Sequence, residues 1–151
     1  MSYTCTKRYQ DIPIAHRLPK HTGHCAKIHG HNIAFEVTFA AKYSDTNNFV
    51  VDFGDLKEIK DFIAAKLDHC FLVDVSDPLH EDISRLNGGT NITLVHSAST
   101  EGIAYYIFEE IRGIINAKTD YRVTVASVTV WEDSKNSATY SEKPDRTYGS
   151  N

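Results

Sequence analysis

The strongest structural constraint in this sequence is a run of alternating residues that follows two closely spaced histidines. Between residues 31 and 41 the odd positions after the histidine are apolar, whereas Asn32 and Glu36 lie on the other face. Such alternation predicts a half-buried β-strand, because successive side chains of a strand point to opposite faces. His29 and His31 both belong to the odd face, so the strand would present two imidazoles on one side.

Two further segments carry apolar residues at helical spacing. The first covers residues 53–67, where Asp52 or Asp55 could cap the helix, and the second starts near Ser99 and ends before Asp120. Apolar residues at every third or fourth position predict amphipathic helices that each bury one face.

Three weaker strand signals complete the predicted sheet. They lie around residues 3–9, over residues 121–132 and near residues 138–142. In the second, the apolar phase slips at Ala126–Ser127, which predicts a β-bulge. The order of strands, two helices and then strands indicates an α+β fold with a mostly antiparallel sheet rather than repeated βαβ units.

Composition narrows the functional classes. The 151 residues fit one domain over residues 1–151, and 41% hydrophobic with 24% charged residues is typical of a globular protein. The net charge of -4 and the scattered basic residues argue against nucleic acid as a partner, because phosphate backbones are bound by clustered Lys and Arg. The sequence shows no signal peptide and no run near the roughly 20 apolar residues of a membrane span, so a cytoplasmic protein without membrane contact is expected. Three widely spaced cysteines indicate free thiols.

Histidine is concentrated in one part of the chain. Five of the eight histidines fall within residues 16–31. The triplet His29-Gly30-His31 can offer two imidazoles to one ion, and His16 is the natural third ligand. Neutral imidazole suits zinc, and three protein ligands with an open fourth position are typical of a catalytic zinc site. His21 and His24 lie in a loop rich in Lys and Gly and are predicted to be exposed and not ligands. The alternative is a chance His-x-His at the start of a strand.

Four other residues are candidates for chemistry. Cys25, four residues before His29, could be a fourth ligand, a base beside the metal or an inert buried thiol. Asp68 could orient the imidazole of His69 for proton transfer, although an exposed surface pair is the simpler interpretation. Glu132 falls on the apolar phase of its strand, where an unpaired carboxylate is costly, and is therefore a candidate for ligand binding.

Six blocks of sequence resemble one known family, and they occur in that family's order across nearly the whole chain. The blocks are Ala15–Pro19, Cys25-x3-His29-Gly30-His31, Val51-Asp52-Phe53-x2-Leu56-Lys57, Leu67-Asp68-His69, Ser99-Thr100-Glu101 and Glu132. In these blocks the chain resembles the 6-pyruvoyl-tetrahydropterin synthase and 6-carboxytetrahydropterin synthase family.

The resemblance implies roles for individual residues. The family's zinc ligands match His16, His29 and His31. Its general base matches Cys25, and its two-residue proton relay matches Asp68 and His69. The glutamate that anchors the pterin, and that also takes part in the relay, matches Glu132. Ser99 and Thr100 fall where family members hold the pterin.

The resemblance also implies a fold, an assembly and a reaction. The fold is the T-fold, an antiparallel four-stranded sheet with two helices on one face, whose copies assemble into a barrel. Family members are usually hexamers with active sites between subunits, and Asp68 and His69 would come from the neighbour. The implied reaction is the zinc-dependent conversion of 7,8-dihydroneopterin triphosphate to 6-carboxy-5,6,7,8-tetrahydropterin. Triphosphate and acetaldehyde are released, on the way to 7-deazaguanines such as queuosine.

Alternatives remain for the product and for the class of protein. The short spacing from Cys25 to His29 and the block Ala15–Pro19 favour the carboxy product over the pyruvoyl product, which forms by triphosphate elimination without side-chain cleavage. Residues 74–98 are interpreted as a long loop with a short strand near 91–95, which could alter substrate access or subunit contacts, and Cys70 and Phe71 have no clear role. A non-catalytic zinc- or pterin-binding protein and a structural α+β domain with surface histidines are the alternatives of other classes.

Overall fold

The computed structural model of the chain describes residues 2–142. In this part of the chain the elements follow one another in the order β1 (Tyr3–His16), a 3-10 turn (His24–Ala26), β2 (His29–Ala41), α1 (Lys57–Lys66), β3 (Cys70–Asp74), α2 (His80–Leu86), β4 (Ile92–Val95), α3 (Thr100–Thr119), β5 (Val123–Trp131) and β6 (Ser137–Tyr140). The strands form one sheet in the order β4-β3-β1-β2-β5-β6.

The sheet contains the expected antiparallel strands and two more. β1 pairs with β2, β2 with β5 and β5 with β6, all antiparallel. β3 and β4 extend the sheet beside β1 through parallel pairs, so the described sheet has six strands rather than the four expected. β4 is the short strand expected near residues 91–95, whereas β3, with only 5 residues, is too short to show a clear period in the sequence.

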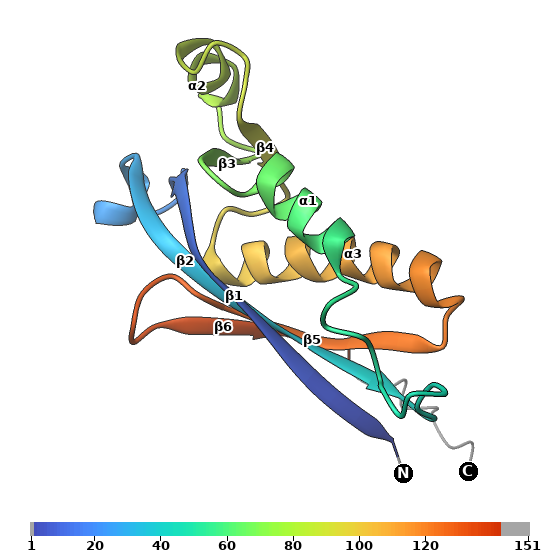
Figure 1. Cartoon of the computed structure of the whole chain (residues 1–151). Helices are drawn as coiled ribbons and strands as arrows, with labels where there is room; N and C mark the ends of the chain where they lie inside the picture. Colours follow the sequence, from blue (N-terminus) through green and yellow to red (C-terminus); the bar gives the residue numbers. More distant parts are fainter. Residues whose placement is uncertain (1, 143–151) are drawn as a thin grey trace, which may run out of the picture.

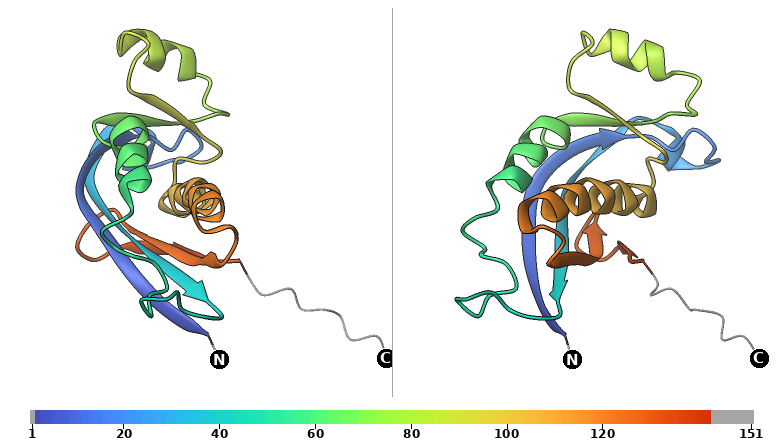
Figure 2. Two further views of the ribbon diagram at one scale, coloured as in Figure 1. Left: turned by 45° about the vertical axis from the view of Figure 1, so that its right-hand side comes forward. Right: turned by 90° about the vertical axis from the view of Figure 1, so that its right-hand side faces the viewer.

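The sheet curls around two of the helices. Figures 1 and 2 show α1 and α3 on the concave side of β1 and β2, and α3 packs against β5 and β6. The apolar stripe of α3, which includes Ile107, Phe108 and Ile111, belongs to the same buried core as Phe35 and Phe39 of β2. Burial of this stripe holds α3 on the sheet, and the prediction of two helices on one face is confirmed.

The starts of the two helices differ in how they are capped. α1 begins at Lys57, and neither predicted aspartate caps it. Asp52 instead accepts the backbone N–H of Gly54 over 2.8 Å, and Asp55 pairs with Lys118 over 3.0 Å. At α3 the hydroxyl of Ser99 accepts the N–H of Gly102 over 3.2 Å, so the predicted helix start is correct.

Residues 74–98 are not a long loop. They contain α2 and β4, and Figures 1 and 2 show α2 at the top of the molecule, away from α1 and α3. The short strand expected near residues 91–95 is confirmed as β4. The predicted bulge in β5 is also present, because Thr38 pairs with Ser127 and Phe39 with Val125, which leaves Ala126 as the extra residue.

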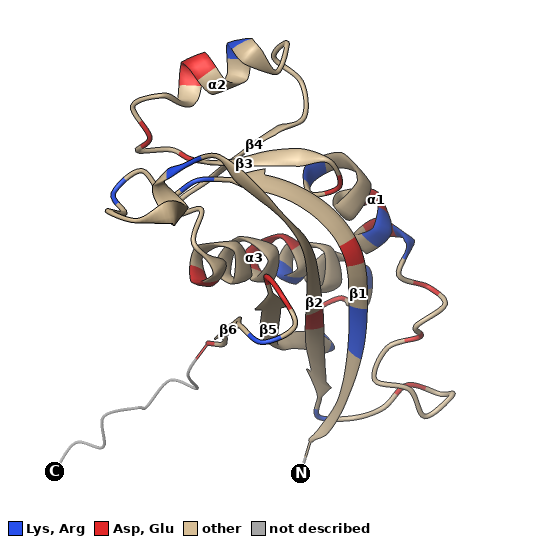
Figure 3. Ribbon diagram, turned by 90° about the vertical axis from the view of Figure 1, so that its left-hand side faces the viewer, with Lys and Arg blue, Asp and Glu red and all other residues tan. Residues whose placement is uncertain are grey.

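Charged residues occur on helices, strands and loops alike, as Figure 3 shows. Arg8 of β1 pairs with Glu36 of β2 over 3.1 Å, and Lys118 of α3 pairs with Glu58 of α1 over 3.0 Å. Ion pairs with exposed partners such as these contribute little to stability, because water and salt screen the charges. No helix among residues 2–142 has the length and apolar character needed to cross a membrane.

Candidate metal and ligand site

A bulge in β1 places His16 beside the two histidines of β2. The register between β1 and β2 shifts between Tyr9 and Ile12, where β1 has one extra residue. Asp11 in this bulge has a φ of 62°, in the left-handed region. One extra residue moves the inward-facing positions of β1 from odd to even numbers, so His16 lies directly opposite His29. The strand expected over residues 3–9 thus continues to the site.

The three predicted ligands converge. The ring centroids of His16 and His29 are 4.5 Å apart, those of His16 and His31 5.1 Å, and those of His29 and His31 5.0 Å. One ring nitrogen from each lies within 4.8 Å of the others, so the group could hold a metal ion. A Cβ at Gly30 would lie 3.0 Å from the carbonyl oxygen of Ile14, so this glycine permits the close approach of β1 and β2.

Hydrogen bonds from the rings leave nitrogen lone pairs free for a metal. Nδ1 of His16 lies 2.7 Å from the carbonyl oxygen of Ala98, and Nδ1 of His29 lies 2.7 Å from that of Lys27. A carbonyl oxygen only accepts, so Nδ1 donates in both rings and Nε2 keeps its lone pair. Within the described chain Nε2 of His16 is buried without a hydrogen-bond partner, which is costly unless a ligand binds it. The donor set therefore fits a metal ion.

The electrostatic environment favours the neutral form of His16. Burial is the largest cause and lowers the pKa of its imidazole, while the hydrogen bond to Ala98 opposes this effect. The neighbouring rings of His29 and His31 lower the pKa further. A metal-binding imidazole must be neutral, so these effects prepare His16 as a ligand.

A pocket of about 440 Å³ lies beside the histidines and joins separate parts of the sequence. Besides the three histidines, its lining includes Cys25, Ser99, Thr100 and Glu132. Its volume is in the range of small-molecule sites. Seven of the nine predicted site residues therefore line one cavity.

Cys25 lies on the 3-10 turn between β1 and β2 and is partly buried. It lines the pocket, yet among the described residues the group able to hold a metal consists of the three histidines without it. The arrangement therefore favours a thiol beside the metal over a fourth ligand. His24, expected to be exposed and not a ligand, is exposed but also lines the pocket.

Glu132 and Thr100 meet at the pocket. Glu132 directly follows β5, and its Oε2 accepts a hydrogen bond from the hydroxyl of Thr100 over 2.6 Å. Ser99 lines the same pocket but uses its hydroxyl to cap α3. The carboxylate of Glu132, which was unexpected on an apolar strand face, thus has a hydrogen-bond donor at the start of α3.

Asp68 and His69 are not among the residues that line this pocket. They form a contact of 2.8 Å between Asp68 Oδ1 and His69 Nδ1, and their side chains are 46% and 75% exposed. His69 has a φ of 55°, and its N–H donates to the carbonyl of Pro13 in β1 over 2.8 Å. The two adjacent side chains therefore interact at the surface. Cys70 next to them is buried, and burial raises the pKa of its thiol.

Gly102 at the start of α3 supports the site without lining the pocket, and this role was not predicted from the sequence. A Cβ at Gly102 would lie 2.2 Å from the carbonyl oxygen of Ser97, so the segment before α3 packs directly on the helix backbone. This contact positions Ser99 and Thr100 at the pocket. A glycine in the first turn of a helix, where it lowers helix propensity, was the available signal.

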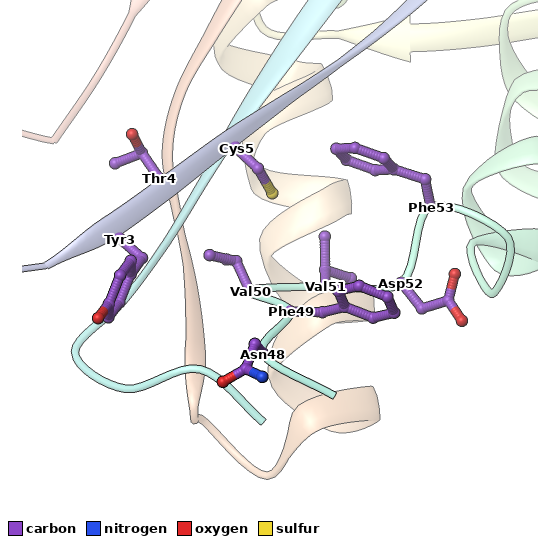
Figure 4. Close-up of a pocket in the computed structure, with 9 residues that line it drawn as sticks. All are labelled: Tyr3, Thr4, Cys5, Asn48, Phe49, Val50, Val51, Asp52 and Phe53. Atoms are coloured by element: carbon purple, nitrogen blue, oxygen red, sulfur yellow. The ribbon is translucent and has the colours of Figure 1, made fainter. Parts of the chain in front are cut away.

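A second pocket of about 380 Å³ lies near the start of β1, lined by Tyr3, Thr4, Cys5 and residues 48–53. Figure 4 shows the sulfur of Cys5 pointing into it, near Val51 and Phe53. Burial raises the pKa of the Cys5 thiol. This pocket is separate from the histidine pocket. Its lining includes the first three residues of the block Val51-Asp52-Phe53-x2-Leu56-Lys57.

Comparison with known proteins identifies the family of this chain. Residues 4–143 match the family described as 6-pyruvoyl tetrahydropterin synthase. A 6-carboxy-5,6,7,8-tetrahydropterin synthase of Rickettsia bellii is 31% identical over 71% of this chain and 78% of its own length. One from Haemophilus influenzae is 29% identical over 85% of this chain and 92% of its own. The 6-pyruvoyl tetrahydropterin synthase of Caenorhabditis elegans has the same fold, with a TM-score of 0.67 and 22% identity over 95% of this chain and 97% of that one. The chain has the T-fold and belongs to the 6-pyruvoyl tetrahydropterin synthase family.

Proposed function

We propose that this chain is a zinc-dependent 6-carboxytetrahydropterin synthase. It would convert 7,8-dihydroneopterin triphosphate to 6-carboxy-5,6,7,8-tetrahydropterin and release triphosphate and acetaldehyde. The observation that carries the proposal is one pocket that combines three convergent imidazoles, a thiol and a carboxylate. Membership of the family and the names of the relatives from Rickettsia and Haemophilus support the reaction class.

His16, His29 and His31 would hold the zinc through the ring nitrogens that remain free. The carbonyls of Ala98 and Lys27 orient two of these rings, as second partners of metal-binding histidines commonly do. Bound zinc would supply Lewis-acid chemistry, which acidifies the side-chain positions of the substrate.

Cys25 would act as the general base. Its thiol lines the same pocket as the histidines and is partly exposed, so it can reach a substrate bound there. As a thiolate it would remove a proton from the substrate side chain while triphosphate leaves. Cys25→Ala is therefore expected to bind zinc and substrate but not to turn over.

Glu132 would anchor the pterin at the other end of the substrate. One oxygen accepts from Thr100, so the carboxylate is held in a fixed orientation. A carboxylate can accept hydrogen bonds from the amino group and a ring N–H of a pterin at the same time. Ser99 and Thr100 would position this anchor and the pterin at the start of α3.

Asp68 and His69 would complete the pocket of a neighbouring subunit. Their pair is exposed and outside the pocket of its own chain. β3 pairs only with Ile14–His16, so among the described residues the earlier part of β1 is an open edge, and β6 is the edge at the other side of the sheet. Open edges can pair with other copies of a chain. We therefore propose a homohexamer with barrel-forming subunits.

The proposed setting is the cytoplasm, in the biosynthesis of 7-deazaguanines such as queuosine. Cys5, Cys25 and Cys70 are free cysteines, which fits a reducing compartment. The carboxy-type names of the relatives favour this product over the pyruvoyl product.

Product analysis tests the proposal. Zinc-loaded protein is incubated with 7,8-dihydroneopterin triphosphate, and pterin products, triphosphate and acetaldehyde are measured. 6-Carboxytetrahydropterin with acetaldehyde is expected. Triphosphate release without acetaldehyde would indicate a pyruvoyl-type synthase. Zinc or pterin binding without release of triphosphate would indicate a non-catalytic protein.

A further inference from the structure

Arg17, the residue after His16, forms a buried ion pair with a residue far along the chain. Its Nε lies 2.7 Å from Oδ2 of Asp77, and its Nη2 lies 3.2 Å from Oδ1. Asp77 is 1% exposed and is one of the buried polar residues of the described chain, together with His16 and Thr93. A buried ion pair is a weak source of net stability, because both charges lose their hydration.

The remaining arm of the guanidinium points to the turn that carries Cys25. Nη1 of Arg17 donates to the carbonyl of Ala26 over 3.2 Å, and the N–H of Leu18 donates to the carbonyl of Cys25 over 2.7 Å. The next carbonyl, that of Lys27, accepts from Nδ1 of His29. Three consecutive carbonyls of this turn are thus bound by residues at the adjoining ends of β1 and β2.

Asp77 is itself fixed by the backbone of the segment before α2. Its Oδ1 accepts the N–H of Leu79 over 2.9 Å, and its own N–H donates to the carbonyl of Asp74 over 2.9 Å. The carboxylate therefore presents two oxygens to Arg17 in a set geometry, which suits the planar fork of a guanidinium. The segment 74–98 supplies this carboxylate to the site.

We propose that Arg17 is a positioning residue that holds the turn of Cys25 beside the histidine pocket, with Asp77 orienting its guanidinium. The proposal rests on the proposed function, in which Cys25 is the base. Neither Arg17 nor Asp77 lines the pocket, so the effect acts through Cys25 and not through contact with substrate.

Arg17→Lys in the zinc-loaded full chain tests the proposal. Lysine keeps the positive charge beside Asp77 but lacks the planar fork that reaches Ala26 at the same time. We expect kcat to fall about tenfold or more while KM stays within about twofold, because zinc, Thr100 and Glu132 are unchanged. We also expect iodoacetamide to alkylate Cys25 at least about threefold faster at fixed pH, because the turn is less constrained. Cys5 and Cys70 are internal references.

Arg85→Lys is the matched control, because Arg85 also pairs with a carboxylate, Asp82, over 3.0 Å but lies on exposed α2. Arg85→Lys should keep the wild-type kcat, KM and alkylation rate of Cys25. Wild-type kcat and a wild-type alkylation rate in Arg17→Lys would overturn the proposal. If that variant does not fold, the same two measurements are made on Arg17→Met/Asp77→Asn, which removes both charges and retains an acceptor for Leu79. An inactive wild-type chain would refute the proposed function. The alkylation rates would still show whether Arg17 holds the turn that carries Cys25.

Discussion

The hydroxyl of Thr100 donates a hydrogen bond to Oε2 of Glu132 over 2.6 Å, which joins the first residue of α3 to the residue after β5. Both residues line the histidine pocket. The first residue of α3 therefore fixes the orientation of the carboxylate. This contact gives a structural reason for the block Ser99-Thr100-Glu101 and the late Glu132 to serve one site.

Thr100→Val should weaken substrate binding more than it slows the chemistry. Valine has nearly the same shape but cannot donate to Glu132, so the carboxylate loses its orientation. A hydrogen bond to a charged group contributes about 1.5–3 kcal/mol, and we expect KM to rise about tenfold or more with a smaller change in kcat. Steady-state kinetics measure both. Thr129→Val is the control, because Thr129 makes an exposed hydroxyl contact with Thr139 on β6. An unchanged KM in Thr100→Val would remove the anchoring role.

His29→Ala should abolish stable zinc binding. It removes one of three convergent ligands, so zinc should fall from about one ion per chain to less than about a tenth after gel filtration. Metal analysis of the purified protein measures this. His21→Asn is the control, because Nδ1 of His21 accepts the N–H of Gly23 and its ring does not line the histidine pocket. Equal zinc content in His29→Ala and wild type would contradict the assignment.

The site could be predicted from the sequence in part. His29 and His31 share a face because a strand has a period of two, and the sequence shows this directly. The position of His16 on the same face depends on the bulge at Asp11, which shifts the phase of β1. A non-glycine residue with positive φ leaves no clear signal, so spacing could nominate His16 but could not orient it.

The long elements of the fold and the short strands β4 and β6 were predicted, whereas β3 and α2 were not. β2 and α3 have many residues in phase, whereas β3 and α2 have only 5 and 7 residues and show no period. The caps proposed at Asp52 and Asp55 were wrong because Asp52 accepts the N–H of Gly54 in a local turn and Asp55 pairs with the distant Lys118. The contact between Arg17 and Asp77 spans 60 positions, and no local pattern announces it.

Gly102→Ala should destabilise the protein. The added methyl group would lie 2.2 Å from the carbonyl oxygen of Ser97, so the segment before α3 must move. We expect a loss of about 1–3 kcal/mol in the free energy of unfolding, measured by urea denaturation at fixed protein concentration. Gly113→Ala in the same helix meets open space and should instead stabilise by about 0.5–1 kcal/mol. Equal effects of the two substitutions would show that the close contact at Gly102 is relieved without cost.

Mixed assemblies of two inactive variants test whether the pocket is completed by a neighbour. Cys25→Ala removes the proposed base and His69→Asn removes the proposed relay, so each variant alone should be inactive. In an equimolar random mixture, about a quarter of the sites would combine an intact Cys25 from one chain with an intact His69 from the next. Activity should therefore recover after the subunits are dissociated together and reassembled.

The control for this experiment is a mixture of Cys25→Ala and His29→Ala. Both residues line one pocket of the same chain, so every site in that mixture lacks one of them and no recovery is expected. If Asp68 and His69 served their own chain, the first mixture would also stay inactive, because each site would lack either the thiol or the imidazole. Recovery of activity in the first mixture but not in the control mixture would therefore establish that Asp68 and His69 act across a subunit boundary.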